Sequence, residues 1–276
     1  MVAVLTALAA SSCWGVADFF GGLQSRRLSV VTVTLGVEGA GLAIVAVLVA
    51  VTATPPPDAG QAVWAMAAGV SGVVGLGAFY RALAVGTMSI VAPVSSMGVA
   101  LPVLVGLASG DRLSAAQSAG LACAVAGVLL AGRERDEAGA STRGLALALA
   151  AAVGFGGYFV GAAQAAEGGV LWTLLLGRAA AMPVLAAVGA ATGARLVPAA
   201  RDAARLAAIG ALDLSATGLY ALATTKGELA IVSVLGALYP VTTVILARGV
   251  LGERLTRAQD LGVLAALAGV ALIAAG

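Results

Sequence analysis

The sequence predicts an all-α integral membrane protein with about ten transmembrane helices, arranged in two inverted five-helix repeats. Two observations lead to this prediction. Of the 276 residues, 61% are hydrophobic and only 10% are charged. Because soluble domains carry about 25% charged residues, most of this surface must face lipid. In addition, one short motif occurs twice, near the middle and near the end of the chain, which indicates an internal duplication.

The repeated motif joins an acidic and a basic residue to the start of an apolar helix. It reads Asp-Arg-Leu-Ser-Ala-Ala-Gln over residues 111–117 and Glu-Arg-Leu-Thr-Arg-Ala-Gln over residues 253–259, an offset of 142. Both copies contain the spacing of a capping box, in which a Ser or Thr and a Gln satisfy the first amides of a helix. The capping pairs are Ser114 with Gln117 and Thr256 with Gln259, the following glycines are Gly120 and Gly262, and Ala-Gly-Val follows at 126–128 and 268–270.

Ten apolar runs are separated by polar or proline-rich breaks, and each is near the ~20 residues that a helix needs to cross a bilayer. The alternation that is typical of membrane strands is absent. The runs are 2–23, 29–51, 61–80, 87–108 and 115–132 in the first half, and 143–163, 169–191, 204–223, 228–250 and 257–275 in the second. Since the most polar stretch is 133–137, we expect a first repeat over 1–135 and a second over 136–276.

The duplication extends beyond the repeated motif, with further matches at an offset of 141. Trp14-Gly15 matches Phe155-Gly156, and the matched glycines are Gly36 with Gly177, Gly69 with Gly210, Gly77 with Gly218, and Gly86 with Gly227. Five spans are an odd number, so the second half must enter the membrane from the opposite side. Inverted repeats of this kind provide two interchangeable packings around a central site, which is the physical basis of alternating access.

Basic residues are distributed unequally over the connections between spans. The even-numbered connections contain only Arg112 and Lys226, whereas eleven arginines lie in or beside odd-numbered ones. The positive-inside rule therefore places the odd-numbered connections in the cytoplasm and both termini outside. The residues of the odd-numbered set are Arg26, Arg27, Arg133, Arg135, Arg143, Arg195, Arg201, Arg205, Arg248, Arg254 and Arg257.

On these motifs the chain resembles the drug/metabolite transporter superfamily, specifically the EamA-type ten-helix transporters. The resemblance covers nearly the whole chain and rests on the paired Glu-Arg-Leu-type motifs, the Trp-Gly of the first span and the helix count. Asp111 departs from the glutamate that is more usual there but keeps its charge. The resemblance implies export or exchange of small metabolites, amino acids or drugs. It also implies two cytoplasmic termini, which opposes the distribution of basic residues.

These observations predict a secondary transporter in the cell membrane that works by alternating access, coupled to protons or to a counter-substrate. Its partners would be a small-molecule substrate and the lipid bilayer, with no nucleic acid, and it would be a monomer or a homodimer. The alternative is a facilitative channel or pore for small solutes. A membrane-embedded enzyme is disfavoured because the chain has no histidine and no dense motif of reactive groups. We expect no catalytic residue, no metal site and no cofactor.

Charged residues inside apolar spans are the strongest candidates for substrate binding or coupling, because burying a charge in a bilayer is costly. Asp18 follows Trp14 by four residues, so a carboxylate and an indole share one helix face and suit an amine or a proton. Asp18 could instead pair with one of the arginines that follow the span. Glu38 and Arg178 lie at matching depths, so Arg178 either binds a substrate carboxylate or neutralises Glu38. Asp213 is the fifth candidate.

A second group of charged residues lies at span ends and is expected to form turns or gates. Arg81 is predicted to extend its charge towards the membrane surface. Both repeated motifs are predicted to close turns through ion pairs and to place charge at a helix start, and their charged members are Asp111, Arg112, Glu253 and Arg254. The tyrosines at positions 80, 158, 220 and 239 are expected to pack or to lie at the interface rather than to form a binding cage.

Overall fold

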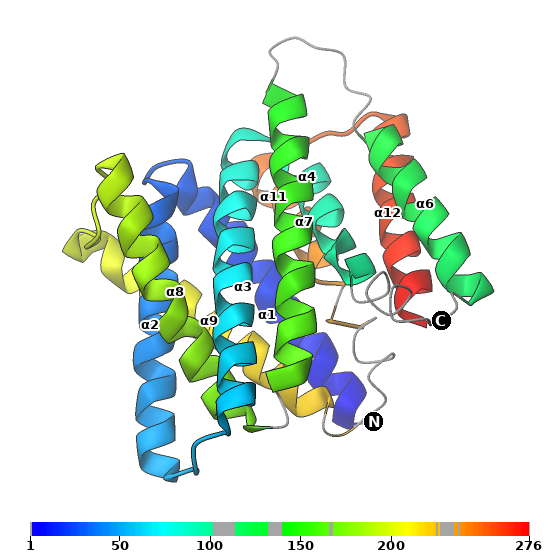
Figure 1. The fold of residues 1–276 in the computed structure, drawn as a ribbon. Helices are drawn as coiled ribbons and strands as arrows, with labels where there is room; N and C mark the ends of the chain where they lie inside the picture. The colour runs from blue at the N-terminus through cyan, green and yellow to red at the C-terminus, as the bar shows by residue number, and fades with distance from the viewer. Residues whose placement is uncertain are drawn as a thin grey trace.

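The computed structural model describes residues 2–101, 114–131, 140–165, 168–224, 226, 235–236 and 238–275. Within these ranges the chain forms helices and no strand (Figure 1). The first-half helices are α1 Val2–Ser25, α2 Val30–Thr52, α3 Ala59–Val85, α4 Met88–Ser95 with the 3₁₀ helix η1 Ser96–Val99, and α6 Ala115–Ala131. The second-half helices are α7 Ala140–Ala165, α8 Val170–Thr192, α9 Ala200–Thr224, α11 Tyr239–Leu251 and α12 Arg257–Ala275.

Six of the described helices are long and apolar enough to cross a membrane, namely α1, α2, α3, α7, α8 and α9. Their bounds agree with the predicted spans to within five residues at each end. Four shorter apolar helices accompany them, at 88–98, 115–127, 239–251 and 260–272. The predicted spans 87–108 and 228–250 fall partly outside the described residues, so ten full spans remain a prediction.

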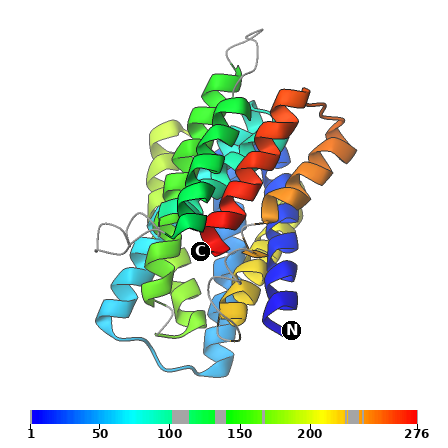
Figure 2. The same cartoon turned by 90° about the vertical axis from the view of Figure 1, so that its right-hand side faces the viewer.

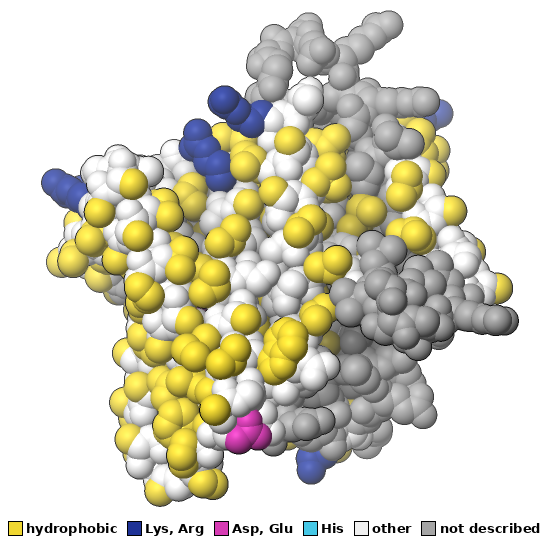
Figure 3. Space-filling view, viewed as in Figure 1, with side chains coloured by type: hydrophobic (Ala, Val, Ile, Leu, Met, Phe, Trp, Pro, Cys, Tyr) yellow, Lys and Arg dark blue, Asp and Glu magenta, His cyan; other side chains and the backbone are white. Residues whose placement is uncertain are grey.

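The outer surface of the helices is apolar, as a lipid-facing surface requires. Large hydrophobic side chains are exposed along several helices, for example Val47 on α2, Val153 on α7 and Ile245 on α11. Figure 3 shows hydrophobic side chains over the middle of one face, and most of the visible Lys and Arg side chains at its upper end. We call this upper end, which carries the odd-numbered connections, the basic end.

Helices of the two halves interleave, and their contacts come in matching pairs. α3 packs against α7 and α8, and α9, its counterpart in the second half, packs against α1 and α2. In the same way α4 contacts α7 while α11 contacts α1. The last helices of the two halves, α6 and α12, pack on each other at one side of the molecule (Figures 1 and 2). Each half therefore completes the other's core.

Paired glycines bring the interleaved helices close together. A Cβ atom built on Gly69 of α3 would collide with the backbone of Gly177 on α8. The duplicated contact repeats this feature, because a Cβ on Gly210 of α9 would collide with the carbonyl oxygen of Val37 on α2. Small residues of this kind allow helix backbones to approach closely in a bilayer, where hydrophobic burial drives little association.

Side-chain caps fix the starts of several helices. The capping box predicted for Ser114 and Gln117 is confirmed, with the amide of Gln117 donating to Ser114 Oγ at 3.0 Å and the amide of Ser114 donating to Gln117 Oε1 at 2.9 Å. A further capping box, formed by Asp58 and Gln61, starts α3 and was not predicted. It follows the three prolines that end the turn after α2.

The glycine contact at Gly69 gives a test with a matched control on the same helix. Gly69→Ala should lower the free energy of unfolding by about 1–3 kcal/mol, because backbone rather than a flexible side chain must move. Gly77→Ala should be neutral or slightly stabilising, since its Cβ meets nothing within 4 Å and alanine favours helix. Thermal unfolding of both variants in detergent measures the difference. Equal unfolding temperatures would contradict the close α3–α8 contact.

Candidate functional site

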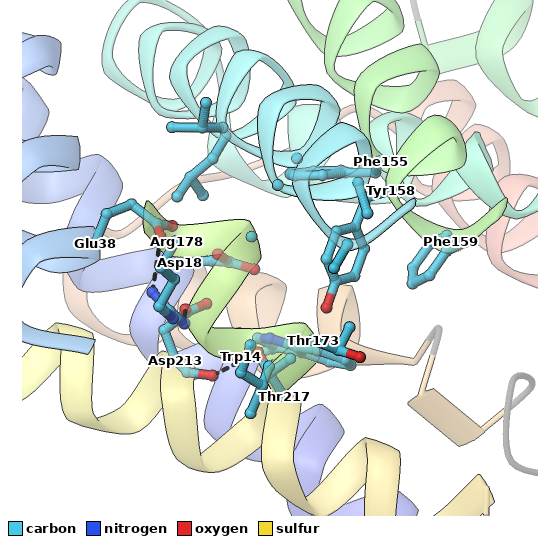
Figure 4. A pocket seen from close by; sticks show the side chains of 18 of the residues that line it. Trp14, Asp18, Glu38, Phe155, Tyr158, Phe159, Thr173, Arg178, Asp213 and Thr217 are labelled. Atoms are coloured by element: carbon cyan, nitrogen blue, oxygen red, sulfur yellow. Dashed lines mark hydrogen bonds and ion pairs between the residues drawn. The ribbon is translucent and has the colours of Figure 1, made fainter. Parts of the chain in front are cut away.

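A cavity lies where the helices of the two halves meet. It encloses about 950 Å³ of space between protein atoms, part of it open to solvent. Residues of α1, α2, α3, α4, η1, α7, α8, α9 and α11 line it, so both halves contribute. All five residues predicted to bind substrate or to couple transport lie on its wall: Trp14, Asp18, Glu38, Arg178 and Asp213 (Figure 4).

Arg178 forms a buried bridge between two carboxylates. Its Nη1 donates to Glu38 Oε2 at 2.8 Å, and its Nη2 donates to Asp213 Oδ2 at 2.5 Å. The three side chains are only 7%, 11% and 13% exposed, in the order Arg178, Glu38 and Asp213. We refer to these residues as the charge cluster. It connects α8 to α2 and α9, so of the two roles predicted for Arg178 the structure displays the neutralising one.

The position of the guanidinium depends on a glycine in α2. A Cβ on Gly41 would stand 2.6 Å from Arg178 Nη1 and 3.0 Å from Nε, so only glycine leaves room for the side chain. Nε is buried and has no hydrogen-bond partner within the described part of the chain. The guanidinium therefore lies directly beside the backbone of α2, and Arg178 is also one of the residues that line the cavity.

Asp18 enters the same cavity from α1. The residue is only 6% exposed, yet it has no hydrogen bond or ion pair to any of the residues that the structure describes. The predicted alternative was a pair with Arg26 or Arg27. Arg26 instead contacts Glu253 and the carbonyl oxygen of Leu83, and the exposed Arg27 forms no ion pair within the described residues. A buried carboxylate is costly unless it is paired or neutralised, so Asp18 would be stabilised by a proton or by a cationic partner in the cavity.

The acidic groups of the cavity outnumber the basic one. With all three carboxylates ionised, Asp18, Glu38 and Asp213 carry one negative charge each, and Arg178 compensates one of them. Two negative charges are then in excess in a site of low dielectric constant. A bound cation or protons would relieve this excess, whereas an anion would increase it.

Opposite the charge cluster, aromatic side chains of α7 form a wall. We call Phe155, Tyr158 and Phe159 the aromatic wall, and Figure 4 shows it across the cavity from the charged groups. Ring contacts extend it, since Phe159 lies 6.4 Å from Tyr220, and Tyr220 lies 5.5 Å from Trp14, between ring centroids. These rings surround the apolar part of the cavity.

Sequence reasoning missed most of this wall. Tyr158 and Tyr239 were expected to pack or to lie at the interface, but both line the cavity. Only Phe155 carried a signal, because it is the counterpart of Trp14 in the duplicated pattern. Thr173 and Thr217 also line the cavity and were not singled out. When aromatic and hydroxyl residues are scattered along an apolar span, the sequence does not show which of them face the cavity.

Glu253 of the second repeated motif caps a helix of the other half. Its Oε1 accepts from the amide of Met88 at 3.0 Å, and its Oε2 accepts from the amide of Ser89 at 2.9 Å. A carboxylate at the start of α4 satisfies free amides and complements the helix dipole. Arg26 Nη2 lies 3.8 Å from Glu253 Oε1 and completes the contact. Glu253 thus places its charge at a helix start, as expected, but the helix belongs to the other half, so the contact links the two halves at the basic end.

The remaining turn and gate candidates lie away from the cavity or outside the described residues. Arg81 is exposed near the end of α3, as the prediction of a surface charge requires. Arg254 is also exposed and forms no ion pair within the described ranges, so the motif does not close its turn internally. Asp111 and Arg112 lie outside the described residues. The described residues include no group of His, Cys, Asp and Glu side chains placed to hold a metal ion.

Comparison with known proteins agrees with this architecture. A family model described as the EamA-like transporter family matches the chain twice, over residues 1–133 and 142–275. The chain belongs to the EamA-like transporter family. Its members are membrane transporters rather than enzymes, so this is a multi-pass membrane protein that contacts lipid and small solutes. A search of curated proteins found no significant match.

A solved structure supports the same fold for this EamA-family chain. It is described only as "Crystal structure of protein", and it is 18% identical in sequence with a TM-score of 0.66. The match covers 98% of this chain and 96% of the other. At this level of identity the likeness concerns the fold alone.

The charge cluster of this EamA-family protein can be tested through stability. Arg178→Gln would leave two buried carboxylates without a cation, which should cost roughly 3–5 kcal/mol of folding free energy. Adding Glu38→Gln and Asp213→Asn to that variant should recover much of the loss, because no uncompensated charge then remains at the bridge. Unfolding in detergent, followed by circular dichroism, measures the series.

The control for this series is Arg201→Gln at the start of α9. The Arg201 side chain is 87% exposed, so its removal should leave the unfolding temperature unchanged. An Arg178→Gln variant as stable as this control would show that the bridge does not hold the three helices together.

Proposed function

We propose that this protein is a secondary transporter that carries small solutes across the cell membrane by alternating access. One observation supports it above the others: buried, unequally compensated charges line a cavity to which both halves of the chain contribute. Ionisable groups inside membrane spans mark substrate and ion pathways, because burying them without function is costly. A cavity at the contact between two repeats is also where transporters bind their substrates.

We further propose ten spans in two inverted repeats, with 1–135 as the first repeat and 136–276 as the second. The matching contacts of α3 and α9 support this arrangement, as do their opposite directions through the molecule (Figures 1 and 2). If the repeats are inverted, each packing adopted by one half is available to the other at the opposite membrane face. This equivalence would provide the two states of a carrier.

The substrate is proposed to be a small metabolite, such as an amino acid or a related compound, or a drug, moved by efflux or exchange. Protons are the proposed coupling ion, and Asp18 is their proposed acceptor because it is buried without a partner in the described chain. Clustered arginines at the basic end favour a cytoplasmic position for that end, which would place both termini outside.

Metabolite profiling tests the transport function for any endogenous substrate. Strains expressing the wild type or Asp18→Asn at equal membrane levels are compared with an empty-vector strain, and both the medium and the cells are analysed by mass spectrometry. We expect compounds enriched in the medium by the wild type and not by Asp18→Asn, because the variant loses the partnerless carboxylate of the cavity.

Asp58→Asn is the matched control for this comparison. Asp58 is exposed at the start of α3, and asparagine also caps helices well, so transport should persist in this variant. Identical profiles for the wild type and the empty vector, both in the medium and inside the cells, would argue against transport of endogenous metabolites.

A further inference from the structure

The cavity is polarised, with charged groups at one end and the aromatic wall at the other. Figure 4 shows the charge cluster and Asp18 on one side, the aromatic wall opposite, and Trp14 and Thr217 between them. A ligand that fills this space would therefore meet carboxylates with one part of its structure and ring faces with another.

The two ends of the cavity differ because equivalent positions of the two halves carry different side chains. Trp14 and Asp18 on α1 correspond to Phe155 and Phe159 on α7, 141 residues later, and three of the four line the cavity as aromatic rings. The first half contributes an indole and a carboxylate where the second half contributes two phenyl rings. The fold repeats, but the chemistry of the two walls does not, so the site suits a two-ended ligand.

The charged end of the cavity favours a cationic group. Asp18 is more than nine-tenths buried and faces the cavity without a partner among the described residues, next to a cluster that is itself rich in carboxylates. An ammonium group brings up to three donors and a positive charge to such a site. The neighbouring ring of Trp14 would add a cation–π attraction.

The same geometry disfavours a carboxylate on the ligand. Each terminal nitrogen of Arg178 donates a hydrogen bond to a carboxylate, Nη1 to Glu38 and Nη2 to Asp213, so the charge of Arg178 is shared by two anionic partners. A ligand carboxylate would have to compete with these two carboxylates for the single positive charge, and Asp18 would repel it. An amino acid therefore fits less well than the corresponding amine.

We propose that this carrier takes an amphiphilic organic cation: an ammonium head bound at Asp18, joined to an aromatic or apolar body on the aromatic wall, with no carboxylate. The proposal deepens and rests on the transport function proposed above. It narrows the range of small metabolites and drugs to amines of this shape.

Three probes with the same phenyl body and different heads test the proposal. Radiolabelled phenethylamine, phenylalanine and 2-phenylethanol are equilibrated with the full chain in lipid nanodiscs, and saturable binding is measured. Phenethylamine should bind at least ~10-fold more tightly than either of the other probes, since they carry an added carboxylate or lack the charge. Asp18→Asn should weaken its binding at least ~10-fold, whereas Asp58→Asn should leave it unchanged.

Asp18→Glu tests whether the weaker binding of Asp18→Asn comes from the lost charge or from a folding defect. This variant keeps the negative charge, so it should retain most of the affinity for phenethylamine. The proposal is overturned if phenethylamine shows no saturable binding, if phenylalanine or 2-phenylethanol binds equally well, or if Asp18→Asn binds phenethylamine like the wild type.

Counterflow in proteoliposomes separates this proposal from the transport function. Exchange of phenylalanine without exchange of phenethylamine would leave a transporter and overturn the amine class. Asp18-dependent binding of phenethylamine without exchange across the membrane would support the chemistry of the site and contradict transport of this class. Exchange of phenethylamine that is lost in Asp18→Asn supports both.

Discussion

The bridge from Arg178 to Glu38 and Asp213 is the interaction on which the centre of the molecule depends. It connects three helices from the two halves. Removing its charges from water costs free energy, and this cost is offset because both carboxylates lie within hydrogen-bonding distance of the guanidinium. Backbone packing makes this geometry attainable. Gly177 precedes Arg178 and lies against Gly69, while Gly41 leaves space for the guanidinium. Glycine contacts and ion pairs are therefore parts of a single arrangement.

Duplication explains the scaffold, and divergence explains the site. Glycines at the helix contacts are retained in both halves, so the backbones of α3 and α9 approach their partners in the same way. Charged side chains are not retained: Asp213 has Gly72 as its counterpart, and Asp18 has Phe159. A nearly symmetric fold thus encloses an asymmetric cavity, and in the proposed transport cycle this cavity would hold a ligand in one orientation while the surrounding helices exchange their packing.

Much of the fold followed from the sequence, because apolar length and repeated motifs are local signals. The helix bounds, the Ser114 capping box and the placement of Asp18 in the site were all available from them. The pairing of Glu38 with Arg178 was anticipated as an alternative, since equal depth is visible in the repeat. Glu253 was expected to close a turn and to charge a helix start, but the sequence does not show that this helix is α4 of the other half, because its partners lie 164 and 165 residues away. The aromatic wall was not predicted, because the sequence alone does not show which face of a helix points into the cavity.

Distances between α3 and α9 test alternating access by inverted repeats most directly. Spin labels would be placed in a chain without Cys13 and Cys123. One pair, at positions 81 and 201, reports on the basic end, and a second pair, at 60 and 222, reports on the opposite end. All four positions are exposed, and the 141-residue offset relates 81 to 222 and 60 to 201. Double electron–electron resonance should show two label-to-label distances, a short and a long one, and the same two for both pairs. In either state of the carrier, one pair should be at the long distance and the other pair at the short distance. One unchanging distance for each pair would contradict it.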